Sequence, residues 1–384
     1  MEWREILDVH TPRTVARLAG QAVVLCIQDT TELDFTTQPG IAGLGRLSYA
    51  AQPGLYMHPT LAVTPAGLTL GVLDAWLWAR KPKDQPDVKE STRWIEGYEI
   101  VADLAETVPA TRLVYVADRE GDLRALIDAA TRRGPLADGL VRSKRHRKTT
   151  TGAKLWDRLA QSDPLGEVEF TLPAAPDRPA RPVRQTLYRT VVTLPAHHGQ
   201  PAVTVPAILV REEQPPVGEK ALEWRRLTNR TADTLEAVAQ LVDGYRRRWL
   251  VEIFFRIWKS GCRVEALQLG ALERLERALV IYLIIAWRIL HLVTWGRDCP
   301  KLPCDVVFDP EEWQAAWIVA HRTKPPETPP PLGQRVRLIA GFGGFLGRKH
   351  DGHPGPKAIG EGLQKVRAFA IAFEATRAVY AGDG

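Results

Sequence analysis

Cysteine is scarce in this chain, with four residues in 384. Cys26, Cys262, Cys299 and Cys304 are too few and too scattered for the disulfide framework of a small secreted domain. The pair Cys299 and Cys304 has no second pair with the spacing that a zinc knuckle needs. We therefore expect reduced thiols in a cytoplasmic protein.

The sequence also has no hydrophobic run long enough to cross a membrane. Its most apolar stretch, residues 278–287, is shorter than the roughly 20 residues that span a bilayer. Arg288 follows this stretch directly, so we predict a buried helix. Near the N-terminus, Glu2 and Glu5 stand where the apolar region of a signal peptide would begin. We expect no membrane partner.

Neither disorder nor a fibrous structure fits the composition, which is 45% hydrophobic and 25% charged. A length of 384 residues predicts about two or three packed units. Lys and Arg number 51 against 45 Asp and Glu, a formal net charge of +6. This excess of positive charge weakly favours a polyanionic partner.

Two segments have the pattern of strands buried on both faces, and each runs into an aspartate. Residues 21–30 (QAVVLCIQDT) reach Asp29, and residues 112–117 (RLVYVA) are followed by Asp118. Predicted helices from 91 to 107 and from 121 onward give a β-α succession, which places both carboxylates at the carboxyl edge of a sheet. Taken singly, each aspartate could equally be a turn residue or a helix cap, and Asp122 could cap the helix after it.

The composition and hydrophobic pattern of the chain change several times beyond residue 139. A short predicted strand, 139–142, leads into the basic run RSKRHRK, and residues 154–214 then alternate as Val- and Thr-rich segments between Pro-rich turns. This middle segment predicts an inserted antiparallel β unit. Helices are predicted at 234–260, 272–295 and 363–381, with a proline cluster before the last. The predicted domains are 1–153 and 223–297 as two parts of one core, 154–222 as the insertion, and 298–384 as a helical region.

One predicted helix carries a polar and mainly basic face. In YRRRWLVEIFFRIWKSG, Arg248, Glu252 and Lys259 fall within roughly 40° of one another, with Tyr245 and Arg256 beside them. This face is either solvated, with an Arg-to-Glu pair one turn apart, or functional. The functional interpretation requires a negatively charged backbone for the cations and a metal ion for Glu252.

Three carboxylates are thus available, two at strand ends and one on a later helix. Such a set can hold two Mg²⁺ ions, which activate a water molecule and stabilise the departing oxygen when a phosphodiester is cleaved. Mg²⁺ suits this chemistry because it takes oxygen ligands and leaves positions open for phosphate and water.

Most of the chain, from about residue 25 onward, resembles a known family. The segments IQDTTELDFT, VADREGDLRAL, VRSKRHRK and YRRRWLVEIFFRIWKSG are similar to those of DDE transposases of the insertion sequence 4 family, the group of the transposon five transposase. The most specific motif is Tyr-x-x-Arg-x-x-x-Glu-x-x-x-x-x-x-Lys, which Tyr245, Arg248, Glu252 and Lys259 satisfy. The D-T-T and D-R-E blocks precede it in the family's order.

The resemblance implies an α/β fold: a ribonuclease-H-like core of mixed sheet and flanking helices, interrupted by a β insertion before the third acid. It implies that Asp29, Asp118 and Glu252 are catalytic and bind two Mg²⁺ ions, for which Mn²⁺ can substitute. It further implies DNA contacts by a larger set: Tyr245, Arg248, Lys259, Arg256, Arg142, Lys144 and Trp224. For Trp224 the family role is stacking on a flipped base, and the alternative is a core tryptophan. For residues 142–148 the alternative is a solvated loop.

The function implied is cut-and-paste transposition of double-stranded DNA by a homodimer, in the cytoplasm at the nucleoid. Family members carry an N-terminal helical domain that recognises the transposon ends, and few residues precede Asp29 here. A truncated copy, an internal start and a shortened gene product would each explain this difference. The alternative functions are a non-catalytic regulator that pairs with a full-length transposase, and a decayed copy.

Overall fold

Among the residues that the structure describes, 11 strands form one mixed sheet. The computed structural model describes residues 2–38, 40–49, 51–82, 84–85, 87–172, 174 and 179–380. Met1 and residues 381–384, at the ends of the first and last predicted domains, lie outside this part, as does the end of the helix predicted at 363–381. The strands are β1 (Val23–Gln28), β2 (Thr31–Asp34), β3 (Gly45–Arg46), β4 (Pro53–Val63), β5 (Thr69–Trp78), β6 (Arg112–Ala117), β7 (Ala137–Arg142), β8 (Pro164–Leu172), β9 (Arg181–Leu194), β10 (Val203–Arg211) and β11 (Glu223–Thr228).

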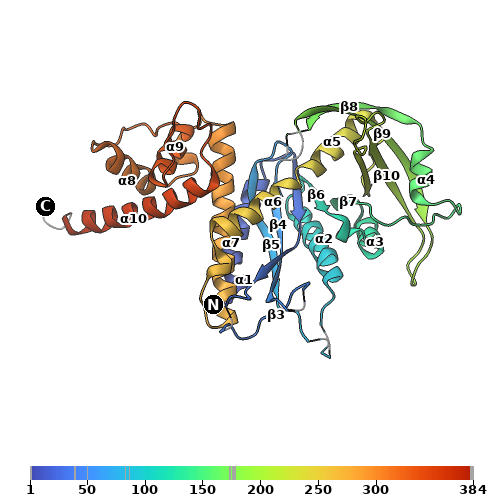
Figure 1. Cartoon of the computed structure of the whole chain (residues 1–384), viewed down its shortest axis with the longest axis horizontal. Helices are drawn as coiled ribbons and strands as arrows, with labels where there is room; N and C mark the ends of the chain where they lie inside the picture. Colours follow the sequence, from blue (N-terminus) through green and yellow to red (C-terminus); the bar gives the residue numbers. More distant parts are fainter. Residues whose placement is uncertain are drawn as a thin grey trace.

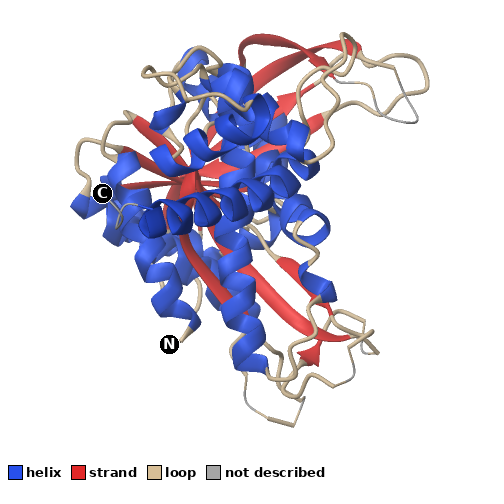
Figure 2. Ribbon diagram, turned by 90° about the vertical axis from the view of Figure 1, so that its left-hand side faces the viewer, coloured by secondary structure: helices blue, strands red, loops and turns tan. Residues whose placement is uncertain are grey.

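The helices flank this sheet and extend beyond it at one end (Figure 1). In Figure 2, which is turned by 90°, helices lie in front of the twisted strands. They are α1 (Trp3–Leu18), α2 (Glu90–Thr107), α3 (Arg124–Arg133), α4 (Leu155–Ala160), α5 (Leu235–Arg246), α6 (Trp249–Arg256), α7 (Leu272–Asp298), α8 (Pro310–His321), α9 (Leu332–Phe342) and α10 (Pro356–Tyr380).

The order of the strands is β2-β4-β1-β6-β7-β11-β10-β9-β8, with β3 and β5 also paired to β4. The central strands β1, β6 and β7 are parallel, and Leu25 lies opposite Val114. Neighbouring parallel strands end at the same edge of a sheet, so the residues that follow β1 and β6 come together there.

Both faces of the central strands are buried, as the apolar runs in the sequence predict. Val24 and Cys26 point into a core shared with Trp94 of α2. Leu25 and Ile27, on the opposite face, pack in the core that α5, α6 and α7 build. Because successive strand residues face opposite sides, β1 is covered by helices from two distant parts of the chain.

The segment predicted as an antiparallel β unit does form antiparallel strands. These strands, β8, β9 and β10, extend the main sheet: β11, which follows the predicted insertion, pairs with β7, and β10, β9 and β8 follow outward in turn. A separate small core lies between these strands and α4, with Leu155 and Leu159 buried in it.

The helix predicted at 234–260 is interrupted, which differs from the expectation of one continuous element. After α5 the hydrogen bonds change from the α-helical to the tighter 3₁₀ spacing of three residues. The Arg248 amide donates to Tyr245 O at 2.9 Å, and the Val251 amide donates to Arg248 O at 3.0 Å. After α6 the backbone widens into a π-helical turn, Ile257–Gly261. The tightening coincides with adjacent arginines that bond in different directions, Arg247 to Pro65 O and Arg248 to Asp29.

The apolar stretch at 278–287 lies within α7, a helix of 27 residues. This differs from the expectation that no segment is long enough to cross a membrane: among the described residues, α7 is the one helix that is long and apolar enough by length and composition, and half of its most apolar part is buried in the protein. It packs against β5, α1, α9 and α10. The helices α8, α9 and α10 pack on one another at the end of the molecule opposite β8–β10 (Figure 1).

Candidate active site and nucleic-acid interface

Asp29 follows β1 directly and is 9% exposed. Its Oδ1 accepts a hydrogen bond from the Thr30 amide at 2.9 Å. The pKa of Asp29 is raised to about 7: burial is the largest cause and the charges of Asp118 and Glu252 also raise it, against the opposing effects of Arg248 and the Thr30 amide. The charges of Asp118 and Glu252, from two other segments, thus act on Asp29.

Arg248 connects two of these carboxylates. Its guanidinium donates to Asp29 Oδ2, and its Nη1 donates to Glu252 Oε1 at 3.2 Å. The pair of Arg248 and Glu252, one helical turn apart, is the pair that the sequence predicts. The additional contact to Asp29 brings α6 onto the end of β1.

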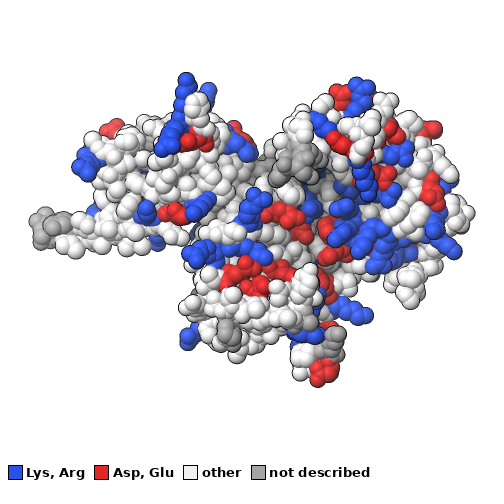
Figure 3. Space-filling view, in the orientation of Figure 1, with Lys and Arg blue, Asp and Glu red and all other residues white. Residues whose placement is uncertain are grey.

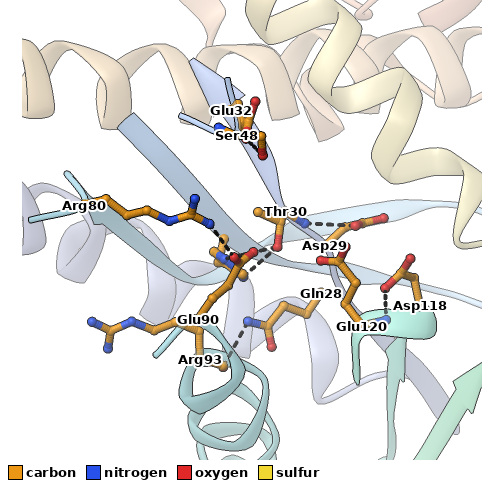
Figure 4. A network of polar contacts seen from close by, with 11 residues as sticks. Gln28, Asp29, Thr30, Glu32, Ser48, Arg80, Glu90, Arg93, Asp118 and Glu120 are labelled. Carbon is orange, nitrogen blue, oxygen red and sulfur yellow. Dashed lines mark hydrogen bonds and ion pairs between the residues drawn. The ribbon is translucent and has the colours of Figure 1, made fainter. Parts of the chain in front are cut away.

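Asp118 follows β6 and begins a short 3₁₀ turn, Arg119–Gly121. Its carboxylate accepts from the Glu120 amide at 2.7 Å, so it does cap a turn. Figure 4 shows that Asp118 nevertheless lies beside Asp29, as the parallel pairing of β1 and β6 requires.

A polar network that includes His58 of β4 reaches Asp29 through Thr30 (Figure 4). The Thr30 hydroxyl is 2.9 Å from His58 Nδ1, and His58 Nε2 is 3.7 Å from Glu90. Arg80 donates to Glu90 at 3.0 Å. No motif in the sequence points to His58 or Glu90. The available signal was a histidine within an apolar strand, because a histidine buried there needs a polar partner. His58 is fully buried in the structure.

The side chains that could hold metal ions are the carboxylates of Asp29, Asp118 and Glu252. Hard oxygen donors of this kind match Mg²⁺. In the part of the chain that the structure describes, no three acidic, His or Cys side chains are close enough together to hold an ion. The Arg248 guanidinium lies between two of the three, so its cation compensates their charge in this structure.

The other residues of the predicted basic face have different surroundings. Tyr245 is 7% exposed, and the Arg226 guanidinium lies 3.6 Å from the centre of its ring. Lys259 donates to Glu32 O at 2.8 Å and is 3.3 Å from Glu265. Arg256 is exposed on α6. The structure thus brings Arg248 and Glu252 to the acidic site, places Lys259 against β2, and leaves Arg256 toward solvent.

Arg142 and Lys144 are both exposed, at the end of β7 and just after it. Arg145 and Lys148 are exposed in the same segment. Figure 3 shows acidic side chains near the centre of this face and basic side chains gathered on the side of α3 and β7. Such an arrangement can attract a phosphate backbone toward the acidic site.

Trp224, on β11, is half-buried. Its ring stacks on Phe170 with 5.7 Å between the ring centres, and it packs against the main core. The guanidinium of Arg246 lies 4.5 Å from the centre of the Phe170 ring. Trp224 therefore already has an aromatic partner within the protein.

Comparison with known proteins identifies two regions that overlap at residues 284–288. Residues 100–288 match the model of the transposase DDE domain, and residues 284–382 match the model of the transposase Tn5 dimerisation domain. This chain is similar to Tn5-type DDE transposases. The DDE match includes Asp118 and Glu252, whereas Asp29 precedes it. Membership of the insertion sequence 4 family stays a prediction.

One solved structure with which the chain shares similarity is described as "Cryo-EM structure of piggyBac transposase synaptic complex with hairpin DNA (SNHP)". The sequences are 12% identical and the TM-score is 0.38. The match covers 75% of this chain and 50% of that chain, so this chain spans half the length of that transposase.

Proposed function

We propose that this protein is a DNA transposase of the cut-and-paste type that depends on divalent metal ions. The observation that supports the proposal is that Asp118 lies beside Asp29 at the carboxyl edge of the sheet, while Arg248 bonds to both Asp29 and Glu252. Two of these acids lie in the region that matches the transposase DDE domain. Membership of the insertion sequence 4 family belongs to the same proposal.

In this proposal Asp29, Asp118 and Glu252 hold two Mg²⁺ ions, with Mn²⁺ as a substitute. When bound, the ions activate the attacking oxygen and stabilise the departing one. Arg248, Tyr245, Lys259 and Arg256 hold phosphates of the transposon end. Arg248 must then exchange a carboxylate for a phosphate, a contact that its planar guanidinium can make equally well.

The reaction is a series of displacements at phosphorus. Water first cleaves a phosphodiester at the transposon end, and the freed 3′-hydroxyl attacks the opposite strand to form a hairpin. Water reopens the hairpin, and the 3′-hydroxyl then joins the target strand. The hairpin step rests on the resemblance to the insertion sequence 4 family. Each displacement needs the reacting oxygens held in line, so positioning supplies much of the rate.

The proposed partners are double-stranded DNA and a second copy of the chain. The exposed cations of residues 142–148 contact phosphates, and Trp224 contacts a displaced base if it separates from Phe170. Residues 284–382, which match the dimerisation domain, pair two protomers so that each binds one end and cleaves the other. The proposed location is the nucleoid within the cytoplasm.

A plasmid nicking assay tests the proposal. The plasmid carries the gene with its native flanking DNA, and the purified protein is added with Mg²⁺ or Mn²⁺. Cleavage at a defined position in the flanks is expected for the parent and for Asp163→Asn, a control at an exposed aspartate before β8. Asp118→Asn should abolish it. Cleavage that persists in Asp118→Asn contradicts the site, and a parent that cuts under neither metal favours the non-catalytic regulator.

A further inference from the structure

Asp122 is a buried carboxylate that follows the turn carrying Asp118. It is 1% exposed, and its side chain is completely enclosed. The sequence offers a capping role for it, but the N-cap of α3 is Leu123. The carboxylate of Asp122 instead bonds to a segment more than 20 positions further along the chain.

Both oxygens of Asp122 accept hydrogen bonds from this segment. Oδ2 accepts from the backbone amides of Lys144 and Arg145, each at 2.7 Å. Oδ1 accepts from Arg147 Nη1 at 2.5 Å, and Arg147 Nη2 donates to the backbone oxygen of Asp122 at 2.7 Å. One residue thus holds two amides and one guanidinium.

These bonds determine which cations of the basic segment face outward. Beyond β7 the amide of Ser143 still bonds to Arg225 O, but the next two amides bond to Asp122. Lys144, Arg145 and Lys148 are exposed, whereas the Arg147 side chain is only 14% exposed. Arg147 therefore anchors the segment, and its neighbours remain available for phosphate.

Backbone hydrogen bonds in the turn before Asp122 connect it to Asp118. The Gly121 amide donates to Asp118 O at 3.2 Å, and the Asp122 amide donates to Arg119 O at 3.4 Å. The strands that precede the two segments are parallel neighbours, with Ala117 opposite Val141. Asp118 and the basic segment are therefore joined through a short turn and one carboxylate.

We propose that Asp122 is a positioning residue that fixes the basic segment 142–148 relative to Asp118, so that DNA held by these cations is aligned with the acidic site. This inference rests on the proposed function, since it assumes that the segment binds DNA and that Asp118 belongs to the cleavage site. Asp122 itself touches neither DNA nor metal.

Asp122→Asn tests this role. The Asn side chain has the same shape, but its NH₂ group must face either the backbone amides or the Arg147 guanidinium, so a donor meets a donor. Charge alone predicts tighter DNA binding, because a negative charge near a polyanion is lost. Positioning predicts slower cleavage even at saturating DNA, by about tenfold or more, because misalignment slows the reaction after binding.

Two measurements accompany the rate. Amide hydrogen exchange over residues 143–147 should be faster in the variant than in the parent, and Mn²⁺ affinity should be unchanged. Asp128→Asn is the matched control: it also removes a buried carboxylate paired with an arginine, Arg124, and it bonds to no residue of the basic segment. Cleavage and exchange in this control should equal those of the parent.

If Asp122→Asn cleaves at the parental rate under saturating DNA, or if exchange over residues 143–147 does not change, the inference is wrong. Should Asp122→Asn fail to fold, Arg147→Gln removes the guanidinium and keeps the two amide bonds, and it should slow cleavage at saturating DNA by several-fold. A parental protein that cleaves no DNA counts against the proposed function instead. In that case the exchange experiment still tests whether Asp122 holds the segment.

Discussion

Arg248 and Asp29 are 219 positions apart in the chain, and the guanidinium of one bonds to the carboxylate of the other. The same guanidinium contacts Glu252 at 3.2 Å, so a fixed cation lies between two carboxylates that the proposed function assigns to metal ions. A metal ion must compete with this cation for the same oxygens. DNA removes the competition if its phosphates take over the guanidinium.

Arg248→Gln should therefore raise the affinity for Mn²⁺ in the absence of DNA, on the order of tenfold, because a half-buried ion pair no longer competes. Titration calorimetry of the DNA-free protein measures this change. The same substitution should slow cleavage, since a phosphate contact is lost. Arg184→Gln is a suitable control because Arg184 is exposed on β9 and pairs only with Glu167 and Glu169 among the ion pairs of the described residues. Unchanged or weaker Mn²⁺ binding in Arg248→Gln would contradict the competition.

Glu252→Gln should abolish DNA cleavage while leaving DNA binding largely intact. The substitution keeps the size of the side chain and an oxygen that can accept from Arg248, but it removes the negative charge that a metal ion requires. A gel-shift assay and a nicking assay on the same preparation separate binding from cleavage. Nicking at the parental rate would show that Glu252 is not a ligand.

The sequence predicts the geometry of the strand-end acids well. Strand β6 has the predicted bounds, and β1 differs from its prediction by two residues at each end. An apolar run buried on both faces is a strong local signal, and parallel neighbours in a β-α succession must end at one edge. The proximity of Asp29 and Asp118 follows from these two facts.

The remaining contacts of the site depend on tertiary structure and have no local pattern. The contact of Arg248 with Asp29 requires α6 to pack across the end of β1. The periodicity of a helix predicts which residues share a face, but not which element that face packs against. Asp122 has the sequence context of a cap, and only the course of the chain after β7 shows what it bonds. The interruption after α5 likewise has no local signal: Arg247 bonds to Pro65 O in the turn after β4, and Arg248 bonds to Asp29 after β1.

Gly97→Ala should destabilise the protein on the order of 1–3 kcal/mol. A Cβ at Gly97 would lie 1.9 Å from Gln28 Oε1, which already accepts from the Tyr115 hydroxyl at 2.6 Å. Gln28 is fully buried and cannot move aside without losing this bond. Chemical denaturation measures the effect. Gly341→Ala is the matched control, because that helical glycine has open space and should be neutral or slightly stabilising. Equal stability of the two variants would contradict the close approach of α2 to β1.

Two buried histidines should make the protein sensitive to acid. His10 of α1 and His291 of α7 flank Trp287, with ring centres 4.8 and 5.2 Å from it. His10 Nε2 accepts from the Val72 amide at 3.1 Å, and His291 Nδ1 lies 2.6 Å from Thr69 O. The pKa of each histidine is lowered from 6.5 to about 4, mainly by burial and in part by the Arg17 charge.

Between pH 6.5 and 4 the unfolded chain binds protons at these histidines that the folded chain does not bind. The free energy of unfolding should therefore fall as the pH falls through this range, by on the order of 1–3 kcal/mol per histidine. In His10→Gln the side-chain oxygen can still accept from the Val72 amide. Because glutamine does not titrate, the unfolded variant binds one proton fewer in this pH range. Urea unfolding at pH 7.5, 6 and 5 should show a shallower pH dependence for this variant than for His350→Gln, a substitution at an exposed position. Identical slopes in the two variants would mean that His10 takes up its proton while the chain is still folded, and that α1 does not hold it in a neutral form.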